Sequence, residues 1–214
     1  MTLLHQPVQF FAAARKSLFG GALTTPQVDG LNQLTKAMGA ANWPIADTAY
    51  GLATAYHEVD RTMQPIRERG NGDRDKDGVD DWFEQYDTGR KAATLGNTPA
   101  ADGDGAKWCG RGYCQVTGFN NYSKVDAALG LDGALIADPT LMLQPRVAAP
   151  AMVVGMQTGM FTGKRNADYL PRLGRASTAQ FTQARRIING VDAADKIAGY
   201  AILFQKCLEA GAWH

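Results

Sequence analysis

The sequence predicts a single, mainly α-helical domain with a small β element near its middle. Its 214 residues, 45% hydrophobic and 20% charged, are enough for one full globular core and too few for two large ones. Apolar residues recur at helical spacing along most of the chain. Only the segment "KWCGRGYCQVTGF", residues 107–119, has the glycine, aromatic and β-branched character of a short hairpin.

The predicted helices follow from local signals taken in chain order. Residues 1–21 are amphipathic, and the next helix has Thr25 as its cap with Pro26 at the first helical position. After Pro44, apolar residues recur at helical spacing from Ile45 to Met63. The remaining predicted helices are the apolar stretch 147–161, "FNNYSKVDAAL", "FTQARRIIN", and a last helix capped by Asp192 that runs toward Leu208.

Charge and hydropathy argue against several partners. A formal net charge of +1 provides no long-range attraction to nucleic acid or to an anionic membrane. The longest apolar stretch, residues 147–161, is interrupted by Pro150, Gly155 and Gln157 and is shorter than the about 20 residues that span a bilayer. We therefore expect no nucleic-acid partner and no stable membrane insertion, and the N-terminus shows no visible secretory signal.

The three cysteines show no zinc-ligand or CxxC spacing. Cys109 and Cys114 could pair across a tight turn. Three buried or free thiols in a protein made in the cytoplasm are the favoured interpretation.

One carboxylate stands out at the end of the helix that follows Pro44. The residues that share one face of this helix are Gly51, Thr54, Ala55 and Glu58. Small neighbours should leave Glu58 in a groove with apolar walls, where partial desolvation keeps a proton on the acid near neutral pH. A general acid for glycosidic cleavage needs that property. The alternative is a helix-end glutamate that is solvated or pairs with His57 or Arg61.

Glycoside hydrolysis usually needs a second carboxylate to activate water. Glu68 follows beyond Pro65, which should turn the chain out of the helix. A bent connection could bring Glu68 across a cleft from Glu58. The alternative is a surface glutamate between Arg67 and Arg69.

A third segment, "GRGYCQVTGFNNY" at residues 110–122, offers the donors, acceptors and aromatic faces that a sugar polymer requires. Gly110 and Gly112 allow tight turns or close approach of a ligand. The residues with suitable side chains are Arg111, Tyr113, Gln115, Thr117, Asn120, Asn121 and Tyr122. The alternative is a hairpin that leads into a capped helix.

An acidic window, "DRDKDGVDDWFE" at residues 73–84, matches the calcium-loop pattern D-x-D-x-D-G-x₅-E. The predicted Ca²⁺ ligands are Asp73, Asp75, Asp77, Val79 through its carbonyl, Asp81 and Glu84. Asp80 at the eighth position, and the poor helix formers 70–72 before the window, indicate a single structural loop that braces the segment of Glu68. The alternative is a solvated acidic loop.

The segments "ATAYHEVDRTMQPIRE", "GRGYCQVTGFNNY" and "RRIING" together resemble phage endolysins related to glycoside hydrolase family 19, in the lysozyme-like superfamily. The match runs in order from about residue 45 to residue 205. It implies a single lysozyme-like catalytic domain over residues 1–214, with the β-hairpin lining the cleft. By position, Glu58 would be the general acid, Glu68 the base, and Thr117 a holder of water or substrate; Gln115, Asn121, Tyr122 and Asn189 would line the cleft.

The resemblance favours a monomeric, peptidoglycan-degrading glycosidase of the muramidase type that cuts β-1,4 bonds of glycan strands. Such an endolysin is made in the host bacterial cytoplasm and acts on the wall in the periplasm. The alternatives are a family 19 chitinase and a non-catalytic, calcium-dependent wall-binding or virion protein. Lytic transglycosylation, for which one acid suffices, also stays open.

Overall fold

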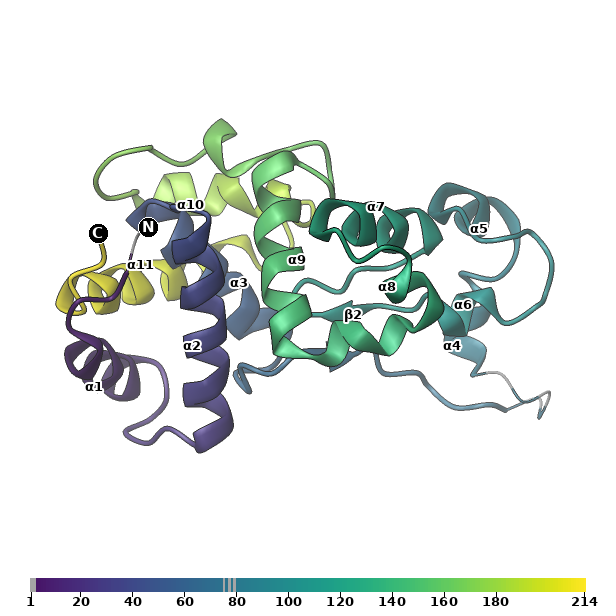
Figure 1. The fold of residues 1–214 in the computed structure, drawn as a ribbon, viewed down its shortest axis with the longest axis horizontal. Helices are drawn as coiled ribbons and strands as arrows, with labels where there is room; N and C mark the ends of the chain where they lie inside the picture. The colour runs from purple at the N-terminus through teal and green to yellow at the C-terminus, as the bar shows by residue number, and fades with distance from the viewer. Residues whose placement is uncertain (1–2, 75, 77, 79) are drawn as a thin grey trace. The chain divides into compact units, whose positions relative to one another are not determined.

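A computed structural model describes residues 3–74, 76, 78 and 80–214. The sequence predicts one domain, and the described residues group into two compact units: Met1–Gln64 with Ala149–His214, and Pro65–Ala148. Helices dominate both units, and the described strands form one two-stranded antiparallel sheet (Figure 1). The prediction of a mainly α-helical protein with a small β element is therefore confirmed.

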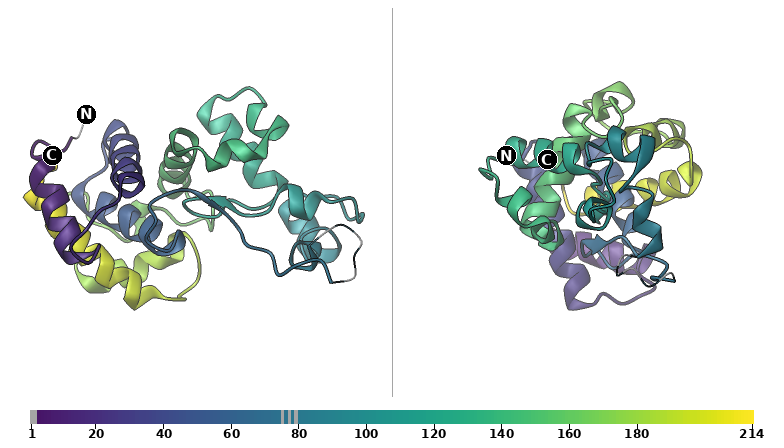
Figure 2. Two further views of the ribbon diagram at one scale, coloured as in Figure 1. Left: turned by 90° about the horizontal axis from the view of Figure 1, so that it is seen from below. Right: turned by 90° about the vertical axis from the view of Figure 1, so that its right-hand side faces the viewer.

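The first unit is built around two helices, α3 and α11, which pack against each other. Its elements are α1 (Pro7–Ser17), α2 (Thr25–Ala40), α3 (Ile45–Glu58), η2 (Asn166–Asp168), α10 (Thr178–Ala184), η3 (Arg185–Ile187), α11 (Ala194–Ala210) and most of α9 (Pro145–Thr158). Helix α11 also packs against α10 and α1, and Figure 2 shows the purple α1 running beside the yellow α11. Near the termini, Leu4 forms a β-bridge with Trp213.

The helix ends differ from the sequence prediction by a few residues, for local reasons. The cap of α2 is Thr24 and not Thr25, because Thr24 and Gln27 form a reciprocal capping box. Helix α3 ends at Glu58, before Met63, because the chain turns through positive φ angles at residues 60, 61 and 63. Helix α11 begins after Ala193, one residue beyond the predicted cap.

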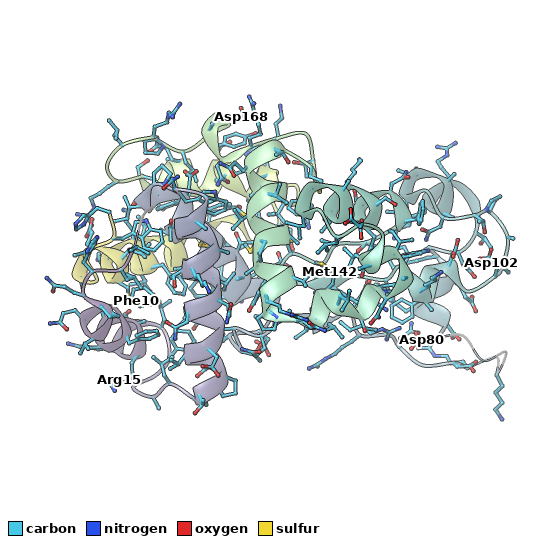
Figure 3. All side chains as sticks on the ribbon, in the orientation of Figure 1. Phe10, Arg15, Asp80, Asp102, Met142 and Asp168 are labelled. Carbon is cyan, nitrogen blue, oxygen red and sulfur yellow. The ribbon has the colours of Figure 1, made fainter. Side chains whose placement is uncertain are left out.

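The small residues of α3 pack into the core and do not line an open groove. Thr54 and Ala55 are fully buried. A Cβ added to Gly51 would lie 2.6 Å from Cε of Met38 and 2.8 Å from the ring of Trp43. The predicted groove beside Glu58 is therefore wrong for this face, because Met38 of α2 and Trp43, just before α3, fill the space that the small side chains leave. Phe10, labelled in Figure 3, is fully buried in the same unit.

The second unit consists of short elements joined by long connections. They are β1 (Ile66–Arg67), α4 (Asp81–Glu84), α5 (Gly89–Leu95), α6 (Asp104–Lys107), β2 (Arg111–Gly112), α7 (Phe119–Leu129), α8 (Ala134–Ala137) and η1 (Pro139–Leu143). The predicted hairpin at 107–119 is reduced to a single bridge between Arg111 and Val116. Strand β2 pairs instead with β1. Met142 (Figure 3) packs against Gly112, where an added Cβ would lie 2.8 Å from its Cε.

The structure describes all three cysteines and the apolar helices. Cys109, Cys114 and Cys207 are all buried, as the favoured interpretation of the cysteines expected. Among the described residues, no helix is both long enough and apolar enough to cross a bilayer.

A buried carboxylate, Asp87, organises the connection between α5 and α6. The residue is 4% exposed, and its two oxygens accept hydrogen bonds from the N–H groups of Gly103 and Gly105 at 3.0 and 2.8 Å. Because buried N–H groups need partners, this one side chain fixes the path of the chain through both glycines.

We expect Asp87→Ala to destabilise the fold by about 1–3 kcal/mol, because it leaves two backbone donors unsatisfied. Urea denaturation followed by circular dichroism measures the change. An Asp87→Ala protein whose unfolding midpoint equals that of the wild type would show that these two hydrogen bonds contribute nothing to stability.

Candidate active site

Glu58 lies at the C-terminal end of α3 and is bound by a buried arginine. Its Oε1 accepts a hydrogen bond from Nη1 of Arg185 at 2.7 Å, and the two side chains are 20% and 3% exposed. Nε of Arg185 donates to the carbonyl oxygen of Asp192 at 3.0 Å, which fixes the guanidinium. Among the described residues, no donor reaches the second oxygen of Glu58, Oε2.

This pairing corrects two expectations. Glu58 is not an unpaired carboxylate, and its partner is neither His57 nor Arg61. Arg185 begins η3, at the start of the "RRIING" segment, and α10 before it is packed against α11. The neighbouring His57 is partly buried, and burial lowers the pKa of its imidazole, with the Glu58 charge opposing that effect. His57 is therefore mainly neutral at neutral pH.

Glu68 follows β1 in the second unit and accepts three hydrogen bonds. Its Oε1 accepts from Nε1 of Trp82 at 2.7 Å and from the hydroxyl of Tyr86 at 2.9 Å. Its Oε2 accepts from the N–H of Gly110 at 3.0 Å. Burial, the bond to Glu68 and its charge raise the pKa of Tyr86, so the phenol keeps its proton and donates. Each carboxylate oxygen has two lone pairs, which leaves one position open on Oε2.

Oε2 of Glu68 lies close to Gly110, near two other predicted site residues. A Cβ added there would lie 3.1 Å from Oε2 of Glu68, 2.9 Å from Oε1 of Gln115 and 3.2 Å from Oγ1 of Thr117. Three oxygens of predicted site residues therefore converge on the space that the missing side chain leaves. A water molecule needs two to four polar partners to bind tightly, and this arrangement provides them.

Three residues predicted to bind substrate are instead part of the interior. Arg111 is 5% exposed and donates from Nη1 to the carbonyl oxygens of Lys107 and Cys109 and to the hydroxyl of Tyr122. Tyr113 and Tyr122 are fully buried. Their aromatic faces thus pack inside the second unit and support β2, which carries the residues around Gly110.

The two asparagines predicted to line the cleft remain at or near the surface. Asn121 is partly buried in α7, and its Nδ2 donates to the carbonyl oxygen of Thr117 at 2.8 Å, which helps to position that residue. Asn189 is exposed, and its Oδ1 accepts from the N–H of Gly190 at 2.8 Å. Asn121 thus belongs to the surroundings of Thr117 in the second unit, and Asn189 to the segment after Arg185 in the first.

The acidic window is described in part. Asp75, Asp77 and Val79 lie outside the described residues, and no metal-binding cluster occurs among the residues that are described. The carboxylate of Asp73 accepts from the N–H groups of Lys76 and Gly78 at 2.6 and 3.0 Å. Gly78 has a φ of +96°, as the sharp turn at the sixth position of a calcium loop requires.

The end of the window is held by Asp80, the residue that departs from the usual pattern. Its carboxylate accepts from the N–H groups of Asn71, Gly72 and Trp82, each at 3.0 Å. Desolvation opposes the change, but these three donors lower the pKa of Asp80. Asp80 thereby ties residues 71 and 72, which come just before the window, to the second half of the window. It also caps α4, which begins at Asp81 and places Trp82 within hydrogen-bonding distance of Glu68.

Three residues of the site were missed by sequence reasoning: Arg185, Trp82 and Tyr86. Arg185 meets Glu58 across 127 positions of sequence, so no local pattern links them. Trp82 was visible only as a residue within the calcium-loop pattern. Its indole N–H, and the hydroxyl of Tyr86, had no sequence signal that tied them to Glu68.

Comparison with known proteins identifies the fold. No known protein-family model matches the chain, and no curated protein matches it significantly. Among solved structures, chitinase C from Streptomyces griseus HUT6037 matches with a TM-score of 0.60 and 20% identity over 96% of this chain and 77% of that one. A mutant of chitinase C matches with a TM-score of 0.60 and 19% identity over the same shares. The predicted fold class, mainly α and lysozyme-like, is thereby confirmed.

Proposed function

We propose that this protein is a glycoside hydrolase that cleaves β-1,4 bonds of peptidoglycan by general acid and base catalysis. The observation that carries the proposal is the state of its two predicted catalytic carboxylates. Glu58 and Glu68 are each fixed by donors, yet each keeps a lone-pair position open on Oε2. A carboxylate that only stabilises the fold would not need this combination of a fixed orientation and an open oxygen.

In this proposal Glu58 is the general acid. Arg185 holds Oε1 of Glu58 whether or not the acid is protonated, because the carbonyl oxygen of a neutral carboxyl group still accepts a hydrogen bond. The proton then resides on Oε2, and it passes to the glycosidic oxygen as the bond to the leaving sugar breaks. The 20% exposure of Glu58 lets solvent return a proton after each turnover.

Glu68 is the general base in the same proposal. A water molecule beside Gly110 would donate one hydrogen to Oε2 of Glu68 and the other to Gln115 or Thr117. Its lone pair would then be free to attack the anomeric carbon while Glu68 takes up the proton. Because water attacks directly, the product should have the inverted anomeric configuration.

Peptidoglycan is favoured over chitin by the sequence resemblance to phage endolysins. The likeness to chitinase C supports a glycan substrate without distinguishing between the two polymers. The assays that separate them are the clearing of outer-membrane-permeabilised bacteria and the release of sugar from chitin. A protein that binds walls and cleaves neither polymer would instead have the non-catalytic role. We further propose action on the wall as a monomer, in the periplasm.

We also propose that Ca²⁺ binds the acidic window. Asp73, Asp81 and Glu84, with Asp75, Asp77 and the carbonyl of Val79, would form an all-oxygen ligand set, which suits a hard cation. The positive φ of Gly78 and the start of α4 at Asp81 fit the second half of such a loop. The cation would offset repulsion among the carboxylates. Trp82 donates a 2.7 Å hydrogen bond to Glu68, so a loop that Ca²⁺ holds in place would also hold the side chain of Glu68 in place.

Glu58→Gln should lower the rate of wall lysis by roughly a hundredfold or more, since an amide cannot donate a proton in the same way. The amide oxygen can still accept from Arg185, so the protein should fold with at most a modest loss of stability. Turbidity assays beside a chitin assay measure activity, and circular dichroism checks folding. Glu209→Gln, on the surface of α11, is the matched control. Near-normal lysis by folded Glu58→Gln would remove Glu58 from catalysis.

Gly110→Ala should fill the space that Glu68, Gln115 and Thr117 face, and should lower kcat by about ten- to a hundredfold. The backbone at Gly110 is not in the left-handed region, and the tightest contact, at 2.9 Å, is with the flexible end of the Gln115 side chain, which can shift, so folding should tolerate alanine. The control is Gly199→Ala, where an added Cβ meets open space on α11. If kcat is unchanged in the folded Gly110→Ala protein, the water position proposed here is wrong.

Ca²⁺ should raise the melting temperature, because a ligand that binds only the folded state stabilises it by about 2.7 kcal/mol at a hundredfold excess over Kd. A chelator, or Glu84→Ala, should reverse the shift and lower lysis. Trp82→Phe removes the indole donor to Glu68, so it should lower lysis while leaving the Ca²⁺-dependent thermal shift in place. A melting temperature and an activity that are both indifferent to Ca²⁺ and chelator would leave only a solvated acidic loop.

A further inference from the structure

Trp82 leaves much of its indole ring in solvent, right beside the proposed base. It is 41% exposed, whereas the other three tryptophans of the chain are 6% exposed or less: Trp43, Trp108 and Trp213. The large apolar side chains that the described part of the first unit exposes are all aliphatic: Leu3, Val8, Leu173 and Val191. Tryptophan has the largest apolar surface to gain from burial, so its exposure at this position indicates a surface for a ligand.

The exposed ring is also held in one orientation. The backbone N–H of Trp82 donates to Oδ1 of Asp80 (labelled in Figure 3) at 3.0 Å, and its carbonyl oxygen accepts from Nε2 of Gln85 at 2.7 Å. The indole Nε1 donates to Oε1 of Glu68 at 2.7 Å. A side chain that is already fixed loses little entropy when a ligand binds to it. Trp82 is therefore preorganised as well as exposed.

The hydrogen bond to Glu68 uses the edge of the ring and leaves its faces free. The only polar hydrogen of an indole is on Nε1 and lies in the plane of the ring, so the carboxylate of Glu68 lies beside the ring and not above it. A flat ligand stacked on an exposed face of Trp82 would thus be placed next to Glu68. The indole would orient the base and position the ligand at the same time.

A β-1,4-linked sugar ring fits this surface. When the substituents of a pyranose are equatorial, its axial C–H bonds form an apolar face with a slight positive charge, and the face of an aromatic ring is negative. The hydroxyl and acetamido groups stay at the rim of the sugar, in contact with water. We propose, on the basis of the proposed function, that the exposed face of Trp82 binds a sugar ring of the glycan strand next to the bond that is cut.

Trp82 would then have two roles that mutation can separate. The N–H orients Glu68, which acts in the chemical step, so its loss lowers kcat. The ring face binds the glycan before and during the reaction, so its loss raises KM. Phenylalanine keeps an aromatic face but has no N–H, whereas alanine lacks both. A residue that only orients Glu68 would give the same KM with either substitution.

The first experiment measures kcat and KM on soluble, uncrosslinked glycan strands at a fixed Ca²⁺ concentration. Trp82→Phe should lower kcat and leave KM within about twofold of the wild-type value. Trp82→Ala should lower kcat to a similar extent and also raise KM about five- to tenfold. Leu173→Ala, which shortens an apolar side chain that is 89% exposed in the first unit, is the control and should change neither constant.

The second experiment observes the wild-type Trp82 side chain, so it stays valid if Trp82→Ala fails to fold. Acrylamide should quench mainly the fluorescence of Trp82, because the other three tryptophans are buried. In the full Glu58→Gln protein, a tetrasaccharide of alternating N-acetylglucosamine and N-acetylmuramic acid should remove most of this quenching. The double variant Glu58→Gln, Trp82→Phe is the control and should show little quenching with or without the tetrasaccharide.

The outcomes separate this inference from the proposed function. Protection of Trp82 by the tetrasaccharide, without cleavage of any glycan by the wild type, would support the sugar surface and refute the glycosidase. Cleavage by the wild type, with quenching that saturating tetrasaccharide leaves unchanged, would overturn the sugar surface and keep the glycosidase. Equal KM values for Trp82→Phe and Trp82→Ala would likewise overturn it and leave Trp82 with the single role of orienting Glu68.

Discussion

The second unit depends on one carboxylate, Glu68, which accepts three hydrogen bonds from two separate segments. Trp82 in α4, Tyr86 after it, and the backbone of Gly110 before β2 all converge on this side chain. The backbone N–H of Glu68 in turn donates to the carbonyl oxygen of Gly110 at 2.7 Å. The acidic window, the buried tyrosine and the β1–β2 pair are therefore joined at the residue we propose as the general base. When the Glu68 side chain is fixed, these three parts of the unit are fixed with it.

The first unit has a corresponding constraint in Arg185. A guanidinium that is 3% exposed must have partners, because an unpaired buried charge is strongly destabilising. Glu58 provides one and the carbonyl oxygen of Asp192 the other. The arginine therefore fixes the orientation of the proposed acid and the turn that leads into α11. This explains how a glutamate at a helix end, which would normally be mobile and solvated, can be held in one position.

Local signals in the sequence predicted much of the fold. The rest depends on pairing between residues that are distant in the sequence, which local signals do not reveal. Helix α7 has the predicted bounds, Phe119–Leu129, and α3 begins at Ile45 after Pro44 as expected. The partner of β2 was missed because it lies in β1, on the other side of the acidic window. The environment of Glu58 was misjudged for the same reason. Composition suggested an open groove, but Met38 and Trp43 fill the space beside the small residues.

The residues of the candidate site differ in how much the sequence could reveal. Glu58, Glu68, Gln115 and Thr117 were found through motifs. Their partners Arg185, Trp82 and Tyr86 were not, because these side chains meet the two carboxylates only in the folded chain. The proposed catalytic groups are thus accessible from sequence, whereas the groups that orient them require coordinates.

The central claim is that two carboxylates hydrolyse a glycan strand by direct attack of water. Proton NMR of the first products from purified peptidoglycan tests it most directly, because the anomeric proton is recorded before mutarotation. The account predicts new reducing ends that appear first as the α-anomer, inverted from the β-linked substrate. Products with a retained β-anomer, or anhydro-sugar ends without hydrolysis, would contradict the assignment of Glu68 as a base that activates water.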